Sequence, residues 1–144
     1  MTQEEKELLL KDLSARLPYG VMISHRGLVR PLFNVSPTQH FQITLDNAID
    51  GEHNGLVYVS LDNVADDVKP YLRPMSSMTE EEKKEFNFLI NGVEERCINA
   101  YGKGGYTLAF TKVNDWLNKR HFDYRGLIEK GLALEAPEGM YKTK

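Results

Sequence analysis

A group of side chains that could bind a metal ion lies between residues 46 and 55. Four residues supply carboxylate or imidazole groups there: Asp46, Asp50, Glu52 and His53. Their spacing is similar to that of a calcium loop, but Ala48 stands where such a loop needs an oxygen ligand. Asp, Asn and Gly are also the usual residues of turns. We therefore interpret residues 46–55 as a solvated loop, and we expect no bound metal and no cofactor.

Cys97 is the single cysteine of the chain, and a cysteine can act as a nucleophile when a base lies beside it. Nothing in the spacing of the four histidines brings one of them to this thiol. Cys97 also belongs to the apolar stripe of an expected helix, which favours a buried and unreactive thiol. Gly102-Lys-Gly-Gly105 lacks the spacing of a P-loop, and adjacent acidic residues do not share a helix face. We therefore assign no catalytic residue.

A basic C-terminal segment offers contact with phosphate. Residues 102–144 carry eight Lys or Arg against five Asp or Glu, whereas the rest of the chain is acidic. Short helices over 112–120 and 123–131, followed by a strand at 132–134, would resemble a winged helix-turn-helix. The residues placed to contact nucleic acid are Lys112, Lys119, Arg120, Arg125 and Lys130. The second helix would contain Gly126, so a helical hairpin that closes the core is the favoured interpretation.

The block from Lys69 to Phe86 joins the two halves of the chain. Two prolines stiffen its first part, and Thr79-Glu-Glu-Glu82 then matches a capping box that begins a helix. Three residues between these features are more specific than a linker requires: Tyr71, Arg73 and Met75. We take them as candidates for docking the two halves together or for contact with a protein partner.

The helices and strands that must position these residues follow one another along the chain, with a helix first, then strands, then mainly helices. A capping box at Thr2–Glu5, followed by leucines at helical spacing, predicts a helix over 3–16. A second helix is expected over 80–100, and residues 62–75 are expected to form a short turn and an extended linker. Alternating apolar residues predict four strands: 21–24, 28–33, 40–45 and 56–61. Pro31 indicates that the second strand is bulged or lies at the sheet edge.

These elements predict an α+β fold. An N-terminal helix packs on a four- to five-stranded antiparallel sheet, which could curl into a small open barrel, and a helical C-terminal half follows. Residues 1–75 form the helix-and-sheet subdomain and residues 76–144 the mainly helical one, and we expect the two to share one core. A chain of 144 residues with 41% apolar residues can form such a core without metal or disulfides.

Composition also bears on where the protein works. The chain has no run of about 20 apolar residues, so no membrane span is expected. Its N-terminus lacks the basic and apolar regions of a signal peptide. A single cysteine excludes an intrachain disulfide and favours a reducing compartment. These features together favour the cytoplasm.

Three stretches of the sequence resemble a family of small uncharacterised proteins encoded by gut anaerobic bacteria and by their prophages and mobile elements. The stretches are Leu17–Val21, Lys69–Phe86, and Trp116–Asn118 together with His121–Pro137. The resemblance implies a bacterial or phage cytoplasmic origin and an accessory role. It implies no activity, no ligand and no catalytic residue.

The function expected first is that of a non-enzymatic binding or adaptor protein with a protein partner. A weak nucleic-acid-binding protein that uses the C-terminal basic residues is the alternative from another class. An enzyme with a cleft between the two halves ranks last, because no catalytic pattern supports it. The strand around Pro31, if it lies at the sheet edge, and any exposed aromatic side chains also leave a homodimer open.

Overall fold

The structure, a computed structural model, describes residues 1–36, 42–49, 52–62, 67–91 and 105–141. Its helices are α1 (Gln3–Arg16), α2 (Glu80–Asn91) and α4 (Gly105–Lys119), with short 3-10 turns η1 (Leu17–Tyr19) and η2 (Met75–Ser77). Its strands are β1 (Met22–His25), β2 (Leu28–Ser36), β3 (Gln42–Ile49), β4 (Glu52–Ser60), β5 (Val68–Leu72) and β6 (Leu134–Glu135). The predicted α+β fold, with an N-terminal helix, a sheet and then helices, is confirmed.

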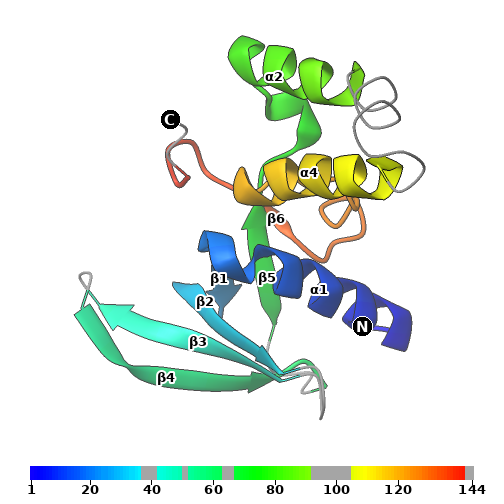
Figure 1. Cartoon of the computed structure of the whole chain (residues 1–144). Coiled ribbons are helices and arrows are strands. Elements are labelled where there is room, and N and C mark those ends of the chain that lie inside the picture. The colour runs from blue at the N-terminus through cyan, green and yellow to red at the C-terminus, as the bar shows by residue number, and fades with distance from the viewer. Residues whose placement is uncertain (37–41, 50–51, 63–66, 92–104, 142–144) are drawn as a thin grey trace.

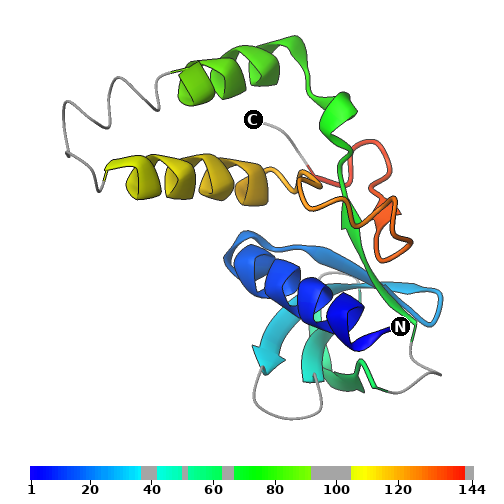
Figure 2. The same cartoon turned by 90° about the vertical axis from the view of Figure 1, so that its right-hand side faces the viewer.

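The sheet has six strands in the order β4-β3-β2-β1-β5-β6, and only the β5–β6 pair is parallel. Strands β4 and β6 are its two edges, so the sheet is open and not closed into a barrel. In Figure 1, β2, β3 and β4 form a curved ribbon, while β5 rises from it towards the helices. Figure 2 shows α2 and α4 lying one above the other, with α1 beneath them against the sheet.

Pro31 lies in an interior strand, because β2 pairs with both β1 and β3. The sheet-edge alternative is therefore wrong, so this strand offers no free edge for a homodimer. The bulge that was the other alternative is present between Leu32 and Asn34. The backbone N–H of Leu32 donates to Val21 on the β1 side at 3.0 Å. Because backbone groups alternate sides along a strand, Pro31 faces the β3 side, where the ladder has not yet begun. Its missing N–H therefore breaks no ladder bond.

Strand β5 replaces the linker that the sequence predicted over 62–75 and pairs with β1 on one side and β6 on the other. Pro70 made this stretch look unlike a strand, and the structure explains why it is tolerated. The carbonyl of Leu72 accepts from Ala136 at 2.8 Å, so Leu72 and also Pro70 face the side of β6. Since the pairing with β6 begins only at Tyr71, Pro70 has no strand opposite it there.

The predicted loop over 46–55 is wrong, because most of it is strand. Strand β3 runs on to Ile49, and β4 begins at Glu52. The register between these strands shifts between Asp46 and Ala48, so the turn-forming residue Asn47 lies in a bulge and not in a loop. Asp50 lies outside the described residues. Within the described ranges, no group of three or more His, Cys, Asp or Glu residues is placed to hold a metal ion.

The C-terminal half differs from the expected helical hairpin. Helix α4 contains the predicted helix 112–120 except for its last residue. Residues 123–131 form turns and not a second helix, so the winged helix-turn-helix lacks its recognition helix. Gly126 and Gly131 have φ values of 72° and 74°, which an α-helix does not allow. The second half of the helix expected over 80–100, which includes Cys97, lies outside the described residues.

Two apolar clusters hold the fold together. The first lies between α1 and the sheet: Leu9, Leu13, Ile23, Leu45 and Leu72 are fully or almost fully buried, and Leu127 and Leu132 join them from the C-terminal half. The second contains Val113, Leu117 and Phe122, with Phe86 and Trp116 packed against them. In the part of the chain that the structure describes, no helix combines the length and apolar character of a membrane span.

Candidate functional site

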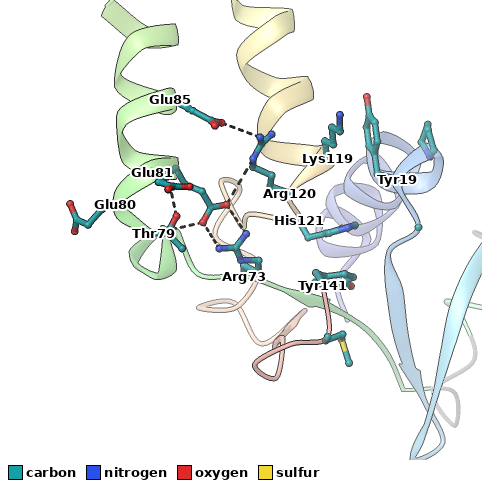
Figure 3. A pocket seen from close by; sticks show the side chains of 14 residues that line it. Tyr19, Arg73, Thr79, Glu80, Glu81, Glu85, Lys119, Arg120, His121 and Tyr141 are labelled. Atoms are coloured by element: carbon teal, nitrogen blue, oxygen red, sulfur yellow. Dashed lines mark hydrogen bonds and ion pairs between the residues drawn. The ribbon is translucent and has the colours of Figure 1, made fainter. Parts of the chain in front are cut away.

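A pocket of about 910 Å³ lies where α2, the end of α4, η1 and the C-terminal segment meet (Figure 3). Its lining brings together residues that are distant in the sequence. Those that decide its chemistry are Tyr19, Arg73, Glu82, Lys119, Arg120, His121 and Tyr141. Three of them, Arg73, Lys119 and Arg120, were predicted from the sequence as contact residues. Glu82 was predicted only as part of a capping box, and the other three were not predicted.

The end of α4 places His121 in the pocket. The N–H of His121 donates to Asn118 at 3.1 Å, and that of Phe122 donates to Leu117 at 3.0 Å, which together form a Schellman C-cap. His121 occupies the left-handed position of this motif, with a φ of 63°. Glycine is usual there, and its absence explains why sequence reasoning missed this site. A non-glycine residue held in this conformation at a pocket is a recognised sign of a functional position.

The backbone then holds Arg73 directly beside His121. The N–H of Arg73 donates to the carbonyl of His121 at 2.7 Å, and the carbonyl of Arg73 accepts from Asp123 at 2.8 Å. These bonds form a parallel bridge between Arg73 and Phe122 that continues β5 beyond its last residue. The two neighbours in the pocket are therefore positioned by backbone hydrogen bonds and not by flexible side chains.

Arg73 also binds α2 to the rest of the protein. Its guanidinium donates to both oxygens of Glu82, at 2.9 and 2.7 Å, and lies 4.2 Å from the centre of the Phe122 ring. Glu82 also accepts from the N–H of Thr79, which completes the predicted capping box. Burial alone would raise the pKa of Glu82, but the bonds from Arg73 and Thr79 outweigh it and hold that pKa below its usual value. Arg73 thus joins the two halves, as one sequence hypothesis proposed.

Arg120 forms a second link between α4 and α2. Its Nη2 donates to Glu85 at 3.0 Å, and its guanidinium lies 4.5 Å from the centre of the Trp116 ring. The indole N–H of Trp116 donates to the same carboxylate oxygen at 3.1 Å. Arg73 and Arg120 therefore fix α2 over the pocket, and their charges are balanced by Glu82 and Glu85.

Tyr141 connects the C-terminal segment to the sheet. Its hydroxyl accepts from the N–H of Met22 and donates to the carbonyl of Tyr71, both at 2.8 Å. Its ring stacks on His121 with 3.7 Å between ring centres. Burial raises the pKa of Tyr141 to about 12, so the residue stays neutral and acts through hydrogen bonds.

The His121 ring has no hydrogen-bond partner among the described residues, although the residue is only 6% exposed. Its Nδ1 is shielded from solvent and unpaired. Burial, and then the positive charges of Arg16 and Arg73, lower the pKa of His121 to about 4. The ring is therefore neutral at neutral pH. A ligand in the pocket cannot bond to the shielded Nδ1, so the contact that it can make is with the remainder of the ring.

A largely buried ion-pair cluster adjoins this site. The Arg16 side chain donates to Asp12 at 2.8 Å and to the carbonyl of Phe122 at 2.6 Å, and Arg125 binds the other oxygen of Asp12 at 2.7 Å. Asp12 and Arg16 are both 0% exposed. Sequence reasoning missed the cluster, but a signal existed: a charged pair at i and i+4 on the same helix face as Leu9 and Leu13.

The other residues predicted as contacts are spread over the surface and core. Lys112, Lys119 and Lys130 are exposed, and only Lys119 of these three lines the pocket. Arg125 is engaged with Asp12, and Met75 packs against the second apolar cluster. Comparisons with protein-family models, with curated proteins and with solved structures found no match.

Tyr141 and Tyr19 provide a matched pair for testing how the C-terminal segment is held. Replacing Tyr141 with phenylalanine should lower the free energy of unfolding by about 1–3 kcal/mol, because two backbone groups lose their partner. Urea denaturation followed by circular dichroism measures this difference. The hydroxyl of Tyr19 has no partner in the described part of the protein, so Tyr19→Phe should change stability by less than about 0.5 kcal/mol. Equal effects of the two changes would contradict the role of Tyr141.

His121 should make stability depend on pH. The unfolded chain binds a proton at this residue below its ordinary pKa of 6.5, whereas the folded protein does so only below about 4. The unfolded state therefore binds more protons between these values, and stability should fall as the pH is lowered from 6.5 to 4, by up to about 3 kcal/mol. Urea denaturation at pH 7, 5.5 and 4.5 measures this slope. His121→Asn, which keeps a residue that tolerates positive φ, should flatten it; an unchanged slope would refute the assignment.

Proposed function

We propose that the protein is a non-catalytic binding module whose ligand site is the pocket beside His121. The observation that supports this most is a preformed pocket lined by the His121 ring, which has no hydrogen-bond partner in the part of the chain that the structure describes. A volume of about 910 Å³ lies within the range of small-molecule and peptide sites, which are usually largely formed before the ligand arrives. Two arginine–glutamate pairs fix the walls, so little ordering remains to oppose binding.

The same geometry favours binding over catalysis. Glu82 and Glu85 are engaged in ion pairs with Arg73 and Arg120, so neither is available as a general base. His121 has no carboxylate or hydroxyl partner among the described residues, whereas an acid–base relay needs one to orient and activate the imidazole. An enzyme with a cleft between the two halves therefore remains the least supported function.

Nucleic-acid binding also has less support than ligand binding in the pocket. Arg125, inside the expected recognition helix, and Arg120, just before it, are each paired with an acidic side chain, and Lys130 is the exposed cation of that stretch. Phosphate contacts need cations that are free to exchange counterions. We extend the proposal, on the sequence resemblance alone, to an accessory protein of bacterial or phage cytoplasm that acts through a bound ligand or peptide partner.

A thermal-shift panel tests the binding function. The panel contains tripeptides, mononucleotides, monosaccharides and dicarboxylates, each at millimolar concentration. A ligand of the folded state raises Tm, so at least one class should raise Tm of the wild type by several degrees. His121→Gly should remove that shift and still fold, because glycine suits the left-handed position that His121 occupies. No shift with any class, or an equal shift in the variant, would contradict the proposed site.

A further inference from the structure

The ladder between β1 and β5 stops at Ile23 and Pro70, although both strands extend one residue further. Its register would next place Met22 opposite Tyr71. The Tyr141 hydroxyl lies there instead, since it accepts from the N–H of Met22 and donates to the carbonyl of Tyr71, both at 2.8 Å. The sheet therefore contains a slot, with a backbone donor on one side and a backbone acceptor on the other.

The contacts in this slot select for a phenol. A single atom that both accepts and donates is needed between the two backbone groups, which a hydroxyl supplies and a carboxylate or an ammonium does not. The ring of Tyr141 stacks on the ring of His121, with 3.7 Å between their centres, as Figure 3 shows. This stacking adds to the free energy gained by burying the ring. A tyrosine side chain is therefore the group that satisfies every contact of the slot.

The segment that carries Tyr141 has few other attachments to the described part of the protein. The N–H of Ala136 donates to β5 at 2.8 Å. Beyond it, the hydrogen bond from Met140 to Pro137 lies within the segment itself, and residues 137–139 are exposed. Among the described residues after Ala136, the Tyr141 side chain alone forms hydrogen bonds to the rest of the chain. Release of this one side chain therefore frees the segment.

Cavities on both sides of Tyr141 give another chain access to the slot. The pocket of about 910 Å³ and a second cavity of about 400 Å³ share Arg73, Thr79 and Tyr141 as lining residues. The second cavity is otherwise lined mainly by residues 136–139 of the segment. The side chain of Tyr141 therefore lies between two spaces, and its release would join them into one larger site that can hold a peptide.

We propose that the slot is a tyrosine-binding site, which the chain's own Tyr141 fills in this structure and which a tyrosine of a peptide partner can occupy in its place. Departure of Tyr141 leaves no backbone group unpaired, because the register already sets the N–H of Met22 opposite the carbonyl of Tyr71 and water can enter from the pocket. This inference rests on the proposed binding function, since the slot adjoins the same pocket, and it names the ligand class.

Tyr141→Ala empties the slot, and NMR titration with N-acetyltyrosinamide and N-acetylphenylalaninamide then tests its chemistry. The tyrosine probe should bind this variant with a Kd at least about tenfold lower, because only a phenol pairs both backbone groups. It should also shift the amide of Met22, whose N–H regains an acceptor. If Tyr141→Ala is unfolded without ligand, the same preference is measured as recovery of its circular dichroism spectrum. Equal binding of the two probes would overturn the proposal.

Titration of the wild type shows whether Tyr141 competes for the same place. The tyrosine probe should bind the wild type at least about tenfold more weakly than Tyr141→Ala, because a tethered side chain competes at a high effective concentration. Tyr58→Ala is the matched control: it removes a tyrosine that is 73% exposed on the β2–β4 ribbon, and it should leave the wild-type Kd unchanged. Equal Kd values for the wild type and Tyr141→Ala would place the probe outside the slot and overturn the proposal.

The outcomes separate this inference from the function on which it rests. If the two probes bind Tyr141→Ala equally but a compound of the panel raises Tm of the wild type, with loss in His121→Gly, the ligand class is wrong and the binding function stands. If no compound of the panel raises Tm of the wild type, the binding function is refuted, and a slot that fills in Tyr141→Ala is then a seat for the chain's own tyrosine alone.

Discussion

Replacing Asp12 with alanine should lower the free energy of unfolding by about 3–5 kcal/mol, the largest effect that the structure implies for a single side chain. Asp12 accepts from both Arg16 and Arg125, and the Arg16 side chain is 0% exposed. Removal of the carboxylate leaves a fully buried guanidinium with only the carbonyl of Phe122 as acceptor. A buried charge without a counter-ion costs more than the lost hydrogen bonds alone.

Urea denaturation of Asp12→Ala, followed by circular dichroism, measures this loss. Lys11→Ala is the matched control, because Lys11 is the neighbouring residue of α1 but is exposed and has no partner among the described residues. Its effect should stay within about 0.5 kcal/mol. A loss below about 1 kcal/mol for Asp12→Ala would show that the cluster does not hold α1 to the C-terminal segment.

Replacing Arg73 with alanine should lower stability by about 2–4 kcal/mol and loosen α2 from the remainder of the protein. The change removes both bonds to Glu82 and the contact with the Phe122 ring, and it leaves Glu82 8% exposed without its cation. Trp116, the single tryptophan, packs against Phe86 of α2 and donates to Glu85, so its fluorescence reports whether α2 is in place.

A red shift of the Trp116 emission and faster quenching by acrylamide should accompany the loss of stability in Arg73→Ala. Lys84→Ala, at an exposed position of the same helix, should change neither. Unchanged emission in Arg73→Ala would mean that α2 is held by other contacts, and Arg73 would then be available to contact a partner.

Local chemistry was predictable from the sequence wherever the interacting groups lie within a few residues of each other. Both capping boxes are present as bonds between Thr2 and Glu5 and between Thr79 and Glu82. The hairpin turn is present at Arg26 and its following glycine, both with positive φ. In each case the geometry depends on residues two or three positions apart, so the pattern alone fixes it.

The elements that the sequence did not reveal depend on distant partners. Pro70 is compatible with a strand only because the pairing of β5 with β6 begins one residue later, at Tyr71. Residues 123–131 satisfy their backbone in turns, with the Asp123 carboxylate accepting from Leu127 and Ile128, where a helix was expected. Neither outcome can be read from a local pattern, because tertiary contacts decide between alternatives of similar local energy.

In the candidate site, too, some residues were predictable from the sequence and others depended on distant contacts. Arg73 stood out because a linker does not need an arginine, and Lys119 and Arg120 stood out as cations. His121 and Tyr141 did not, because a left-handed histidine and a stacked C-terminal tyrosine leave no periodic signal. The pocket exists only where their segments meet, and Tyr141 is 119 positions along the chain from its partner Met22. Sequence patterns could therefore predict several of its cations but not the buried histidine in its wall.

The most direct test of the binding function is where a ligand contacts the protein. NMR titration of the ¹⁵N-labelled chain with the compound panel in pools gives this location from backbone amide shifts. At least one pool should produce saturable shifts at Gly20, Lys119 and His121, and none at Phe33 and Tyr58, which are exposed on the distant β2–β4 ribbon. Saturable shifts centred on that ribbon, or no shift of the pocket amides at millimolar concentration, would contradict the account.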